Sequence, residues 1–331
     1  MRAAYYERKG PAREVLQVGE LPDPEPGPGE VRVRVQLSSV NPSDVKVRSG
    51  WDGDVSMPFP RVIPHQDGMG VVDRVGPGVP AARVGQPVWL FEAQRGRAHG
   101  TACELVAIAA GNAVPVPEGV DPETAACLGV PAMTAHRCLF ADGAIHGQTV
   151  LVAGGGGAVG NAAVQLATWA GARVVTTVSR PEQEAVARAA GAALVLDRRA
   201  GDLARRIADF TRGEGVDRVI EVAFEQNLAL DRQVLRPNGV ISTYASGADP
   251  RATPAIPYRR LQTHNITVHF VGVYGISPEA HRAAARDINA ALAAGKYRTH
   301  VTQRFPLAGI AAAHEAQERG QVVGKIVVRI D

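Results

Sequence analysis

The spacing of hydrophobic positions changes near residue 150 of this 331-residue chain. In residues 30–40, EVRVRVQLSSV, valines alternate with charged side chains, which is the period of a half-buried β-strand. Short apolar runs separated by glycine turns follow in residues 70–79 and 85–93. The Pro/Gly-rich residues 21–30 are typical of a loop. Residues 1–120 are therefore predicted to form a β-rich unit.

From Val150 onward, apolar strands alternate with alanine-rich helical segments such as residues 181–191. This alternation predicts an α/β fold with a doubly wound parallel sheet and helices on both faces. A long helix (residues 278–295) and a last strand (residues 325–330) complete the pattern. The strands of the parallel sheet are expected within residues 149–154, 172–179, 192–197, 216–223 and 239–246.

Composition excludes several other classes of protein. A hydrophobic content of 45% with 21% charged residues is ordinary for a globular domain, and a net charge of +3 from scattered arginines indicates neither nucleic-acid nor membrane binding. Cys103, Cys127 and Cys138 form no C-x-x-C pair, which favours a reduced protein without a structural zinc lobe. With no targeting segment and no apolar run of about 18 residues, we expect a cytoplasmic protein that does not insert into membranes.

Four consecutive glycines, Gly154–Gly157, lie between the strand at residues 149–154 and the next helical segment. Gly155, Gly157 and Gly160 satisfy G-x-G-x-x-G, in which glycines permit a tight turn, close approach to a pyrophosphate and close helix–strand packing. Alone, the motif would indicate only a turn. Because a strand precedes it and a helix and second strand follow, the sequence predicts a dinucleotide site.

The end of the second strand distinguishes NAD from NADP, because an acidic residue there binds the ribose hydroxyls of NAD. This chain has Ser179 and Arg180 instead, and Arg198 or Arg199 after the third strand offers another guanidinium for a 2′-phosphate. We therefore predict NADP (NADPH). Glu182 is expected to bond back to the Ser179 backbone in a capping box. The alternative is that Ser179 is only an N-cap and Arg180 only a solvated charge.

Further segments resemble the zinc-free quinone oxidoreductases, which include zeta-crystallin, of the medium-chain dehydrogenase/reductase superfamily. The resemblance implies a GroES-like β-rich catalytic domain (residues 1–122 and 274–331) and a Rossmann nucleotide-binding domain (residues 123–273). The family usually has glycine where His65 stands, so we expect His65 and Trp51 to reshape the substrate pocket. The segments that carry the resemblance are VNPSDVKVRSG, IPHQDGMGVVDRVGPGV, LGVPAMTAHRCL, IEVAFEQNLALD and GKIVVRI.

The zinc alcohol dehydrogenases of the same superfamily bind their metal through Cys, His and Cys. Asn41, Gln66 and Val130 stand at the matching positions. None of the three offers a thiolate or an imidazole, the ligands that suit Zn²⁺. His65, beside Gln66, has no partner in the sequence pattern. We therefore predict that the protein binds no metal.

The resemblance also implies roles for individual residues. The candidates for the substrate pocket are Asn41, Trp51, Gln66 and Met133, with a turn role as the alternative for Asn41 and a structural hydrogen-bonding role expected for Asp67. No residue is assigned as general acid. Lys325 approaches the nucleotide in one interpretation and is a solvated lysine in the other. The candidate cofactor contacts are Asn41, Thr134, Gly155, Gly156, Gly157, Ala158, Val159, Gly160, Ser179, Arg180, Arg198, Asn227, Ala245, Ser246, Gly247, Phe270, Val271, Gly272 and Lys325.

The activity implied is metal-free hydride transfer from nicotinamide C4 of NADPH to a quinone. The alternative within enzymes is an NADPH-dependent enone (alkenal) double-bond reductase on the same scaffold. A zeta-crystallin-like RNA-binding or structural role is the non-enzymatic alternative, for which the sequence offers no basic–aromatic stripe. The expected partners are the small-molecule quinone or enone and further copies of the chain, as a homodimer or homotetramer.

Overall fold

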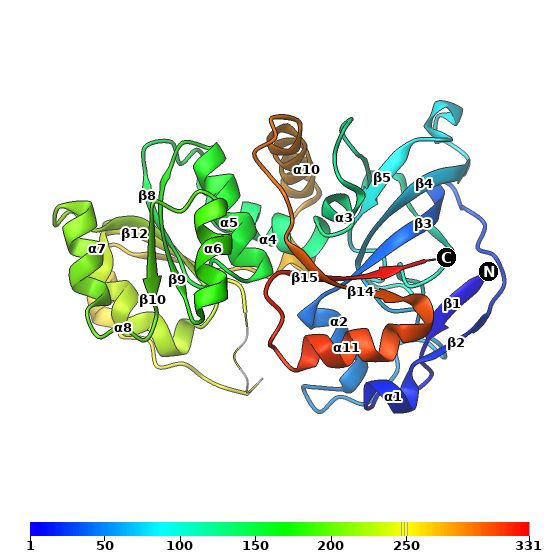
Figure 1. Ribbon diagram of the computed structural model, residues 1–331, viewed down its shortest axis with the longest axis horizontal. Helices are drawn as coiled ribbons and strands as arrows, with labels where there is room; N and C mark the ends of the chain where they lie inside the picture. The colour runs from blue at the N-terminus through cyan, green and yellow to red at the C-terminus, as the bar shows by residue number, and fades with distance from the viewer. Residues whose placement is uncertain (246, 248, 250, 331) are drawn as a thin grey trace. The chain divides into compact units, whose positions relative to one another are not determined.

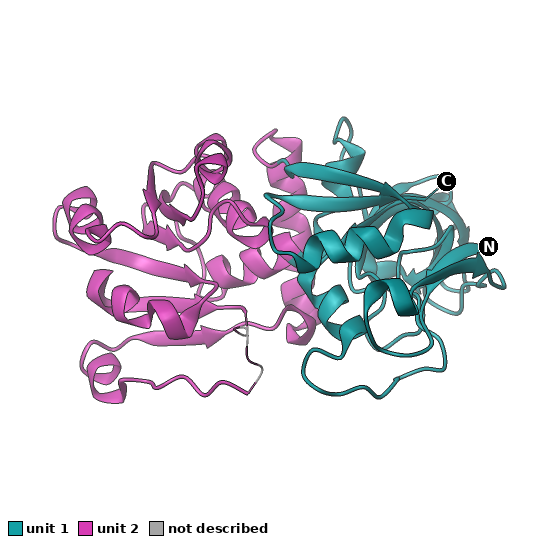
Figure 2. Cartoon of the chain, turned by 60° about the horizontal axis from the view of Figure 1, so that its bottom comes forward, with its two compact units in different colours: residues 1–130, 298–331 teal, residues 131–297 magenta. Residues whose placement is uncertain are grey.

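The computed structural model describes residues 1–245, 247, 249 and 251–330. The chain divides into two compact units, residues 1–130 with 298–331 and residues 131–297 (Figure 2). Residues 123–130 thus group with unit 1 and residues 274–297 with unit 2. Within the described residues, no helix is long and apolar enough to cross a membrane.

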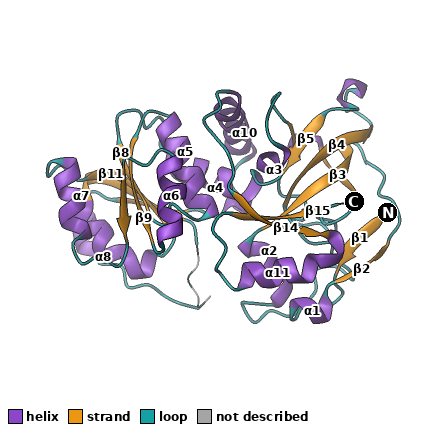
Figure 3. Cartoon of the chain, viewed as in Figure 1, coloured by secondary structure: helices purple, strands orange, loops and turns teal. Residues whose placement is uncertain are grey.

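Unit 1 is built on a seven-stranded, mainly antiparallel sheet in the order β14-β15-β3-β4-β5-β7, with β6 pairing to β3. A small β1–β2 ladder and four helices accompany it (Figure 3). The strands are β1 (Arg2–Tyr5), β2 (Gln17–Glu20), β3 (Glu30–Val40), β4 (Asp67–Val75), β5 (Pro87–Leu90), β6 (Leu105–Ala109), β7 (Ala113–Pro115), β14 (Val301–Pro306) and β15 (Lys325–Arg329). The helices are α1 (Ala12–Val15), α2 (Pro42–Ser49), α3 (Pro122–Ala125) and α11 (Ile310–Glu318).

Strand β3 organises this sheet and confirms the strand predicted for residues 30–40. Val31, Val33 and Val35 are buried in the core, and Val33 lies opposite Val72 of β4 and Val106 of β6. Arg32, one of the alternating charged residues, is also buried and binds both carboxylate oxygens of Asp73, at 2.9 and 3.0 Å. A paired guanidinium can be buried on an otherwise polar face.

Unit 2 contains a six-stranded parallel sheet in the order β10-β9-β8-β11-β12-β13. Chain order reverses direction between β8 and β11, as in doubly wound nucleotide-binding folds. Helices α5 and α6 cover one face, and α7 and α8 the other (Figure 1), which confirms the predicted fold class. The strands are β8 (Thr149–Val152), β9 (Arg173–Val178), β10 (Leu194–Asp197), β11 (Val216–Glu221), β12 (Leu235–Thr243) and β13 (Thr267–Phe270).

The helices of this unit follow the predicted rhythm, and α6 and α10 coincide with the two helices expected at residues 181–191 and 278–295. Helix α4 begins at the end of unit 1 and continues into unit 2. The helices are α4 (Gly129–Phe140), α5 (Ala158–Trp169), α6 (Pro181–Ala189), α7 (Leu203–Thr211), α8 (Phe224–Val234), α9 (Tyr258–Thr263) and α10 (Pro278–Ala293). Short 3₁₀ turns occur at Ala81–Arg83, Ala110–Asn112, Val273–Gly275 and Leu307–Gly309.

His65 lies inside unit 1, fully buried, with both ring nitrogens engaged. Its Nδ1 is 2.7 Å from Ser38 Oγ, and its Nε2 is 2.9 Å from Nε2 of His314, which is also fully buried. The backbone at His65 has φ +80°, in the left-handed region that glycine adopts without strain. These contacts therefore hold a histidine in a backbone conformation that glycine usually adopts. The structure places His65 in the core of unit 1, whereas the sequence predicted that it shapes a substrate pocket.

Burial lowers the pKa of His65 to about 3 and the pKa of His314 well below its usual value. Both rings are thus neutral when folded, whereas unfolded histidines bind protons below about pH 6.5. The free energy of unfolding must then fall as pH drops from about 6.5 toward 3, by up to about 1.4 kcal/mol per pH unit for each histidine.

We predict that His314→Leu makes this pH dependence shallower, because one member of the buried His65–His314 pair is gone. Urea unfolding at pH 7, 6 and 5 measures the slope of the unfolding free energy against pH. This slope is compared between proteins, and not the absolute stability, because the variant also leaves His65 Nε2 without its partner. His300, exposed in the same unit, supplies the control His300→Leu, which should keep the wild-type slope. An unchanged slope in His314→Leu would contradict the assignment.

Candidate functional site

The glycine run forms the turn between β8 and α5. Gly154 has φ +75°, so the left-handed turn falls one residue ahead of the G-x-G-x-x-G motif. A Cβ on Gly155 would lie 2.2 Å from Thr176 Oγ1 on β9, and one on Gly160 would lie 2.2 Å from the Gly154 carbonyl oxygen. Both positions therefore need glycine for packing. A Cβ on Gly157 would approach only the Gly154 carbonyl oxygen, at 3.4 Å, so its other sides are open.

Helix α5 begins at this turn with Gly157 as its N-cap, and no side chain caps it. The Asn161 amide is the first to bond back, to the Gly157 carbonyl oxygen at 2.8 Å. The amides of Ala158, Val159 and Gly160 precede it and have no carbonyl oxygen one turn back within the helix. Together with the helix dipole, these N–H groups favour an anion at this edge of the sheet.

Ser179 and Arg180 follow β9 and are fastened by Gln183 of α6. Gln183 Oε1 accepts hydrogen bonds from the amides of Ser179, at 2.9 Å, and Arg180, at 3.1 Å. The expected bond from Glu182 is therefore wrong, because Pro181 at the first helical position makes Arg180 the N-cap and puts Gln183 at the third position. The Gln183 Cβ would be only 2.5 Å from a Cβ on Gly156, so this side chain also packs on the glycine turn.

A cavity of about 210 Å³ lies where β8, β9, β10 and β11 end. Arg198 lines it, as do Arg199 and Thr177. The two arginines differ in their surroundings. Arg199 pairs with Asp197 at 2.8 Å, which helps lower the pKa of that carboxyl to about 2, whereas the Arg198 side chain has no such partner among the described residues. Arg198 is thus the guanidinium of the two that is available to a bound phosphate.

Asn227 lines the same cavity, and its Nδ2 donates to Glu221 Oε1 at 3.0 Å. Glu221 is fully buried at the end of β11 and also accepts the Ala223 amide, so it holds the loop before α8. Burial and then the Glu221 charge raise the pKa of nearby Asp231 to about 8. Asp231 therefore carries a proton at neutral pH. Asn227 is bonded to Glu221 and lines the same cavity as Arg198, and its contact with a nucleotide stays a prediction.

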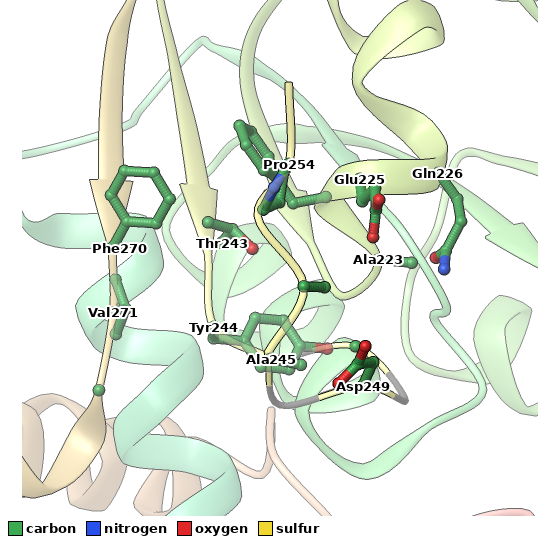
Figure 4. Close-up of a pocket in the computed structure, with 14 residues that line it drawn as sticks. Ala223, Glu225, Gln226, Thr243, Tyr244, Ala245, Asp249, Pro254, Phe270 and Val271 are labelled. Carbon is green, nitrogen blue, oxygen red and sulfur yellow. The ribbon is translucent and has the colours of Figure 1, made fainter. Parts of the chain in front are cut away.

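A larger cavity, of about 370 Å³, lies at the carboxyl ends of β11, β12 and β13. Five of the predicted cofactor residues line it, whereas Ser246 lies outside the described residues. In Figure 4, Phe270 and Val271 form one wall and Glu225 and Gln226 lie on the opposite side. The predicted residues that meet here are Ala245, Gly247, Phe270, Val271 and Gly272.

Sequence reasoning missed several residues of this cavity. Phe224 packs edge-on against Phe270, with ring centroids 5.8 Å apart. Among the described residues, the buried Thr243 Oγ1 has no hydrogen-bond partner, an arrangement that is unfavourable unless a ligand or water supplies one. Their position after β11 and β12, where ligands bind in open α/β sheets, is the signal that could have found them.

Asn41 sits in a buried polar cluster of unit 1. Its Nδ2 donates to Asp67 Oδ2 at 2.8 Å, and its Oδ1 accepts from Lys325 Nζ at 2.6 Å. Lys325 is 2% exposed, so its interpretation as a solvated lysine is wrong. Asp67 also accepts the Val130 amide, at 2.9 and 3.0 Å. Burial raises the pKa of Asp67 to about 6 although Lys325 opposes the rise, and these bonds give Asp67 a structural role.

The remaining candidates lie in different units. In unit 1, Trp51 is half-buried beneath Lys46 Nζ, 3.8 Å from the ring centre, and Gln66 bonds to Gln94 through its side-chain amide at 3.2 Å. In unit 2, Met133 and Thr134 are buried on α4, with exposures of 0% and 5%.

Comparisons with known proteins agree with this architecture. The alcohol dehydrogenase GroES-like domain matches residues 27–118, and the zinc-binding dehydrogenase domain matches residues 158–290. The quinone oxidoreductase of Rattus norvegicus is 28% identical over 278 residues, which is 83% of this chain and 81% of that protein. The chain belongs to the medium-chain dehydrogenase/reductase superfamily of oxidoreductases, as a relative of its quinone oxidoreductases.

Two solved structures superpose on the full chain. An NAD-dependent alcohol dehydrogenase has a TM-score of 0.87 at 27% identity, and the alignment covers 100% of both chains. A mycobacterial protein in complex with NADPH has a TM-score of 0.84 at 28% identity, with 99% of this chain and 100% of that chain covered. Between them, these two similar structures involve both nicotinamide nucleotides, NAD in the first and NADPH in the second.

The zinc implied by the family name does not fit the residues at the corresponding positions. Asn41 and Gln66 offer amides already bonded to other side chains, and Val130 offers an aliphatic group. Across residues 1–245, 247, 249 and 251–330, no three His, Cys, Asp or Glu side chains form a group that could hold a metal ion. The donor set of this chain is thus unlike the thiolate and imidazole set of a zinc site.

We predict that Gln183→Leu accelerates hydrogen–deuterium exchange at the Ser179 and Arg180 amides, because both lose their acceptor. Loss of such a helix-start acceptor costs about 1 kcal/mol, which corresponds to roughly fivefold faster local opening. The matched control Glu182→Leu changes the neighbouring acid and should leave both amides protected. Equal acceleration in both variants would contradict the Gln183 capping.

Proposed function

We propose that this chain is an NADPH-dependent quinone reductase. The observation that carries the cofactor choice is the end of β9, where Ser179 and Arg180 stand instead of a carboxylate and are held beside the glycine turn by Gln183. A hydroxyl and a guanidinium suit a 2′-phosphate, whereas a carboxylate would repel it. The similarity to quinone oxidoreductases supports the acceptor.

The described residues fit a nicotinamide dinucleotide. The pyrophosphate would bind along the backbone of Gly156, at the open face of Gly157 and at the amides of Ala158 and Val159. The 2′-phosphate would contact Ser179, Arg180 and Arg198. The nicotinamide half would occupy the cavity of about 370 Å³, where the buried Thr243 Oγ1 offers a hydrogen-bonding group that no other described residue engages. The walls would be formed by Ala245, Gly247, Phe270, Val271 and Gly272.

The bound nicotinamide would supply the hydride, and the protein's part is to orient the reactants and exclude water. Asn41 is held by Asp67 and Lys325 on opposite sides, so its remaining amide hydrogen is fixed in direction. That hydrogen would bind an acceptor carbonyl. Because Asn41, Gln66 and Val130 do not form a zinc site, hydrogen bonds of this kind would polarise the carbonyl of the acceptor. Solvent supplies the proton in this scheme.

The cofactor proposal predicts that NADPH binds more tightly than NADH in a fluorescence titration. Arg180→Glu should weaken NADPH binding by roughly 10- to 100-fold, the equivalent of about 1.5–3 kcal/mol for a charge-assisted contact, and should change NADH binding little. Arg188, exposed and paired with Glu184 on the same helix, provides the control Arg188→Glu. Equal affinities for the two nucleotides in the wild type would overturn the proposal.

The acceptor proposal predicts that 1,4-benzoquinone and 9,10-phenanthrenequinone are reduced with higher kcat/KM than a simple enone. NADPH oxidation measured with each acceptor ranks them directly. Faster turnover of the enone would favour the double-bond reductase, and binding of NADPH without turnover of any acceptor would contradict both activities.

A further inference from the structure

A third cavity, of about 420 Å³, lies where β12 and β13 begin. The cavity proposed for the nicotinamide lies at the other, carboxyl ends of these strands. Leu235 is the first residue of β12, and Ile266 directly precedes β13. The last turn of α8 and helix α9 with the turn after it complete the walls. None of the roles described above uses this cavity.

The polar part of the lining is cationic. Arg232 and Arg260 both line the cavity, and no carboxylate is among the residues that line it. Arg232 Nε is buried and has no hydrogen-bond partner in the part of the chain that the structure describes. Among the described residues, neither guanidinium forms an ion pair, whereas neighbouring Arg236 pairs with Asp217 at 2.6 Å. A buried donor without an acceptor is unfavourable, so this side of the cavity suits an oxyanion.

His264 fixes the turn that carries Arg260. Its Nδ1 lies 3.0 Å from the Arg260 carbonyl oxygen and 3.3 Å from Thr263 Oγ1. The ring therefore ties the end of α9 to the wall of the cavity through one nitrogen, and Nε2 remains for another partner. The segment that carries Arg260 is thus held without an acidic side chain.

The rest of the lining is apolar. Leu235 and Leu261 are 7% and 8% exposed, and Ile266 is half-buried. A cavity of about 420 Å³ falls in the range of small-molecule sites and is far larger than one phosphate ion requires. We propose that it binds a small organic anion, whose oxyanion head pairs with Arg232 and Arg260 and whose apolar body contacts Leu235, Leu261 and Ile266.

Helix α8 separates this site from the cavity proposed for the nicotinamide. Phe224, Glu225 and Gln226 of its first turn line that cavity, whereas Arg232 and Gln233 of its last turn line this one. An 11-residue helix is about 16 Å long. A ligand here therefore does not overlap a nucleotide at the carboxyl ends of the strands, and the proposal does not depend on the proposed activity.

The test is isothermal titration calorimetry of the full chain with 1-naphthyl phosphate, in the presence of saturating NADP⁺. We expect binding that persists with NADP⁺ and is at least about tenfold weaker in Arg232→Gln and in Arg260→Gln, since each removes a charge-assisted contact. The control Arg236→Gln removes an equal charge at the same end of the sheet and should bind as the wild type does. Arg260 is exposed, so its variant tests the site even if Arg232→Gln fails to fold.

Two further probes separate the parts of the ligand. Inorganic phosphate carries the charge without the apolar body, and 1-naphthol carries the body without the charge, so both should bind at least about tenfold more weakly. The proposal is overturned if 1-naphthyl phosphate gives no heat at millimolar concentration or is displaced by NADP⁺. Equal affinity for 1-naphthol, or wild-type affinity in Arg260→Gln, would overturn it as well.

Discussion

The close approach of β8, β9 and α5 depends on two backbone positions that admit no Cβ. At Gly155 the obstacle is Thr176 of the neighbouring strand, and at Gly160 it is the carbonyl oxygen of Gly154. These contacts bring the start of α5 against the edge of the sheet. The first amides of the helix therefore lie at the point between β8 and β11 where the chain order of the strands reverses. The other candidate nucleotide contacts of unit 2 are arranged around that edge.

Side-chain acceptors hold the loops on either side of this turn. Gln183 binds the two amides after β9, and Glu221 binds the Ala223 amide and Asn227 after β11. In both cases a side-chain oxygen satisfies backbone donors that the strand end leaves without partners, which is the ordinary condition for burying backbone. Glu221 and Asp231 are both buried beside one cavity, and burial raises the pKa of each.

In unit 1, two of the three residues at the positions of the zinc ligands, Asn41 and Val130, belong to a hydrogen-bonded cluster. Lys325 and Asp67 are opposite charges joined through the amide of Asn41, so the buried charges are compensated without a metal. The Val130 amide closes the cluster onto Asp67. His65, two residues before β4, and His314 of α11 form a separate buried pair of neutral rings.

Local pattern by itself determined the parallel sheet, the glycine turn and the absence of an acid after β9. Each of these features depends on residue type and spacing along one continuous stretch of sequence, such as the apolar residues of β8 or Gly155 to Gly160. The tertiary structure decided which side chains meet. It moved the cap from Glu182 to Gln183, buried Lys325, paired His65 with His314 and separated Asn227 from Phe270. The cap depends on Pro181 at the first helical position, which is a local feature of the sequence. The other three outcomes depend on contacts between residues distant in sequence, which propensity and periodicity do not encode.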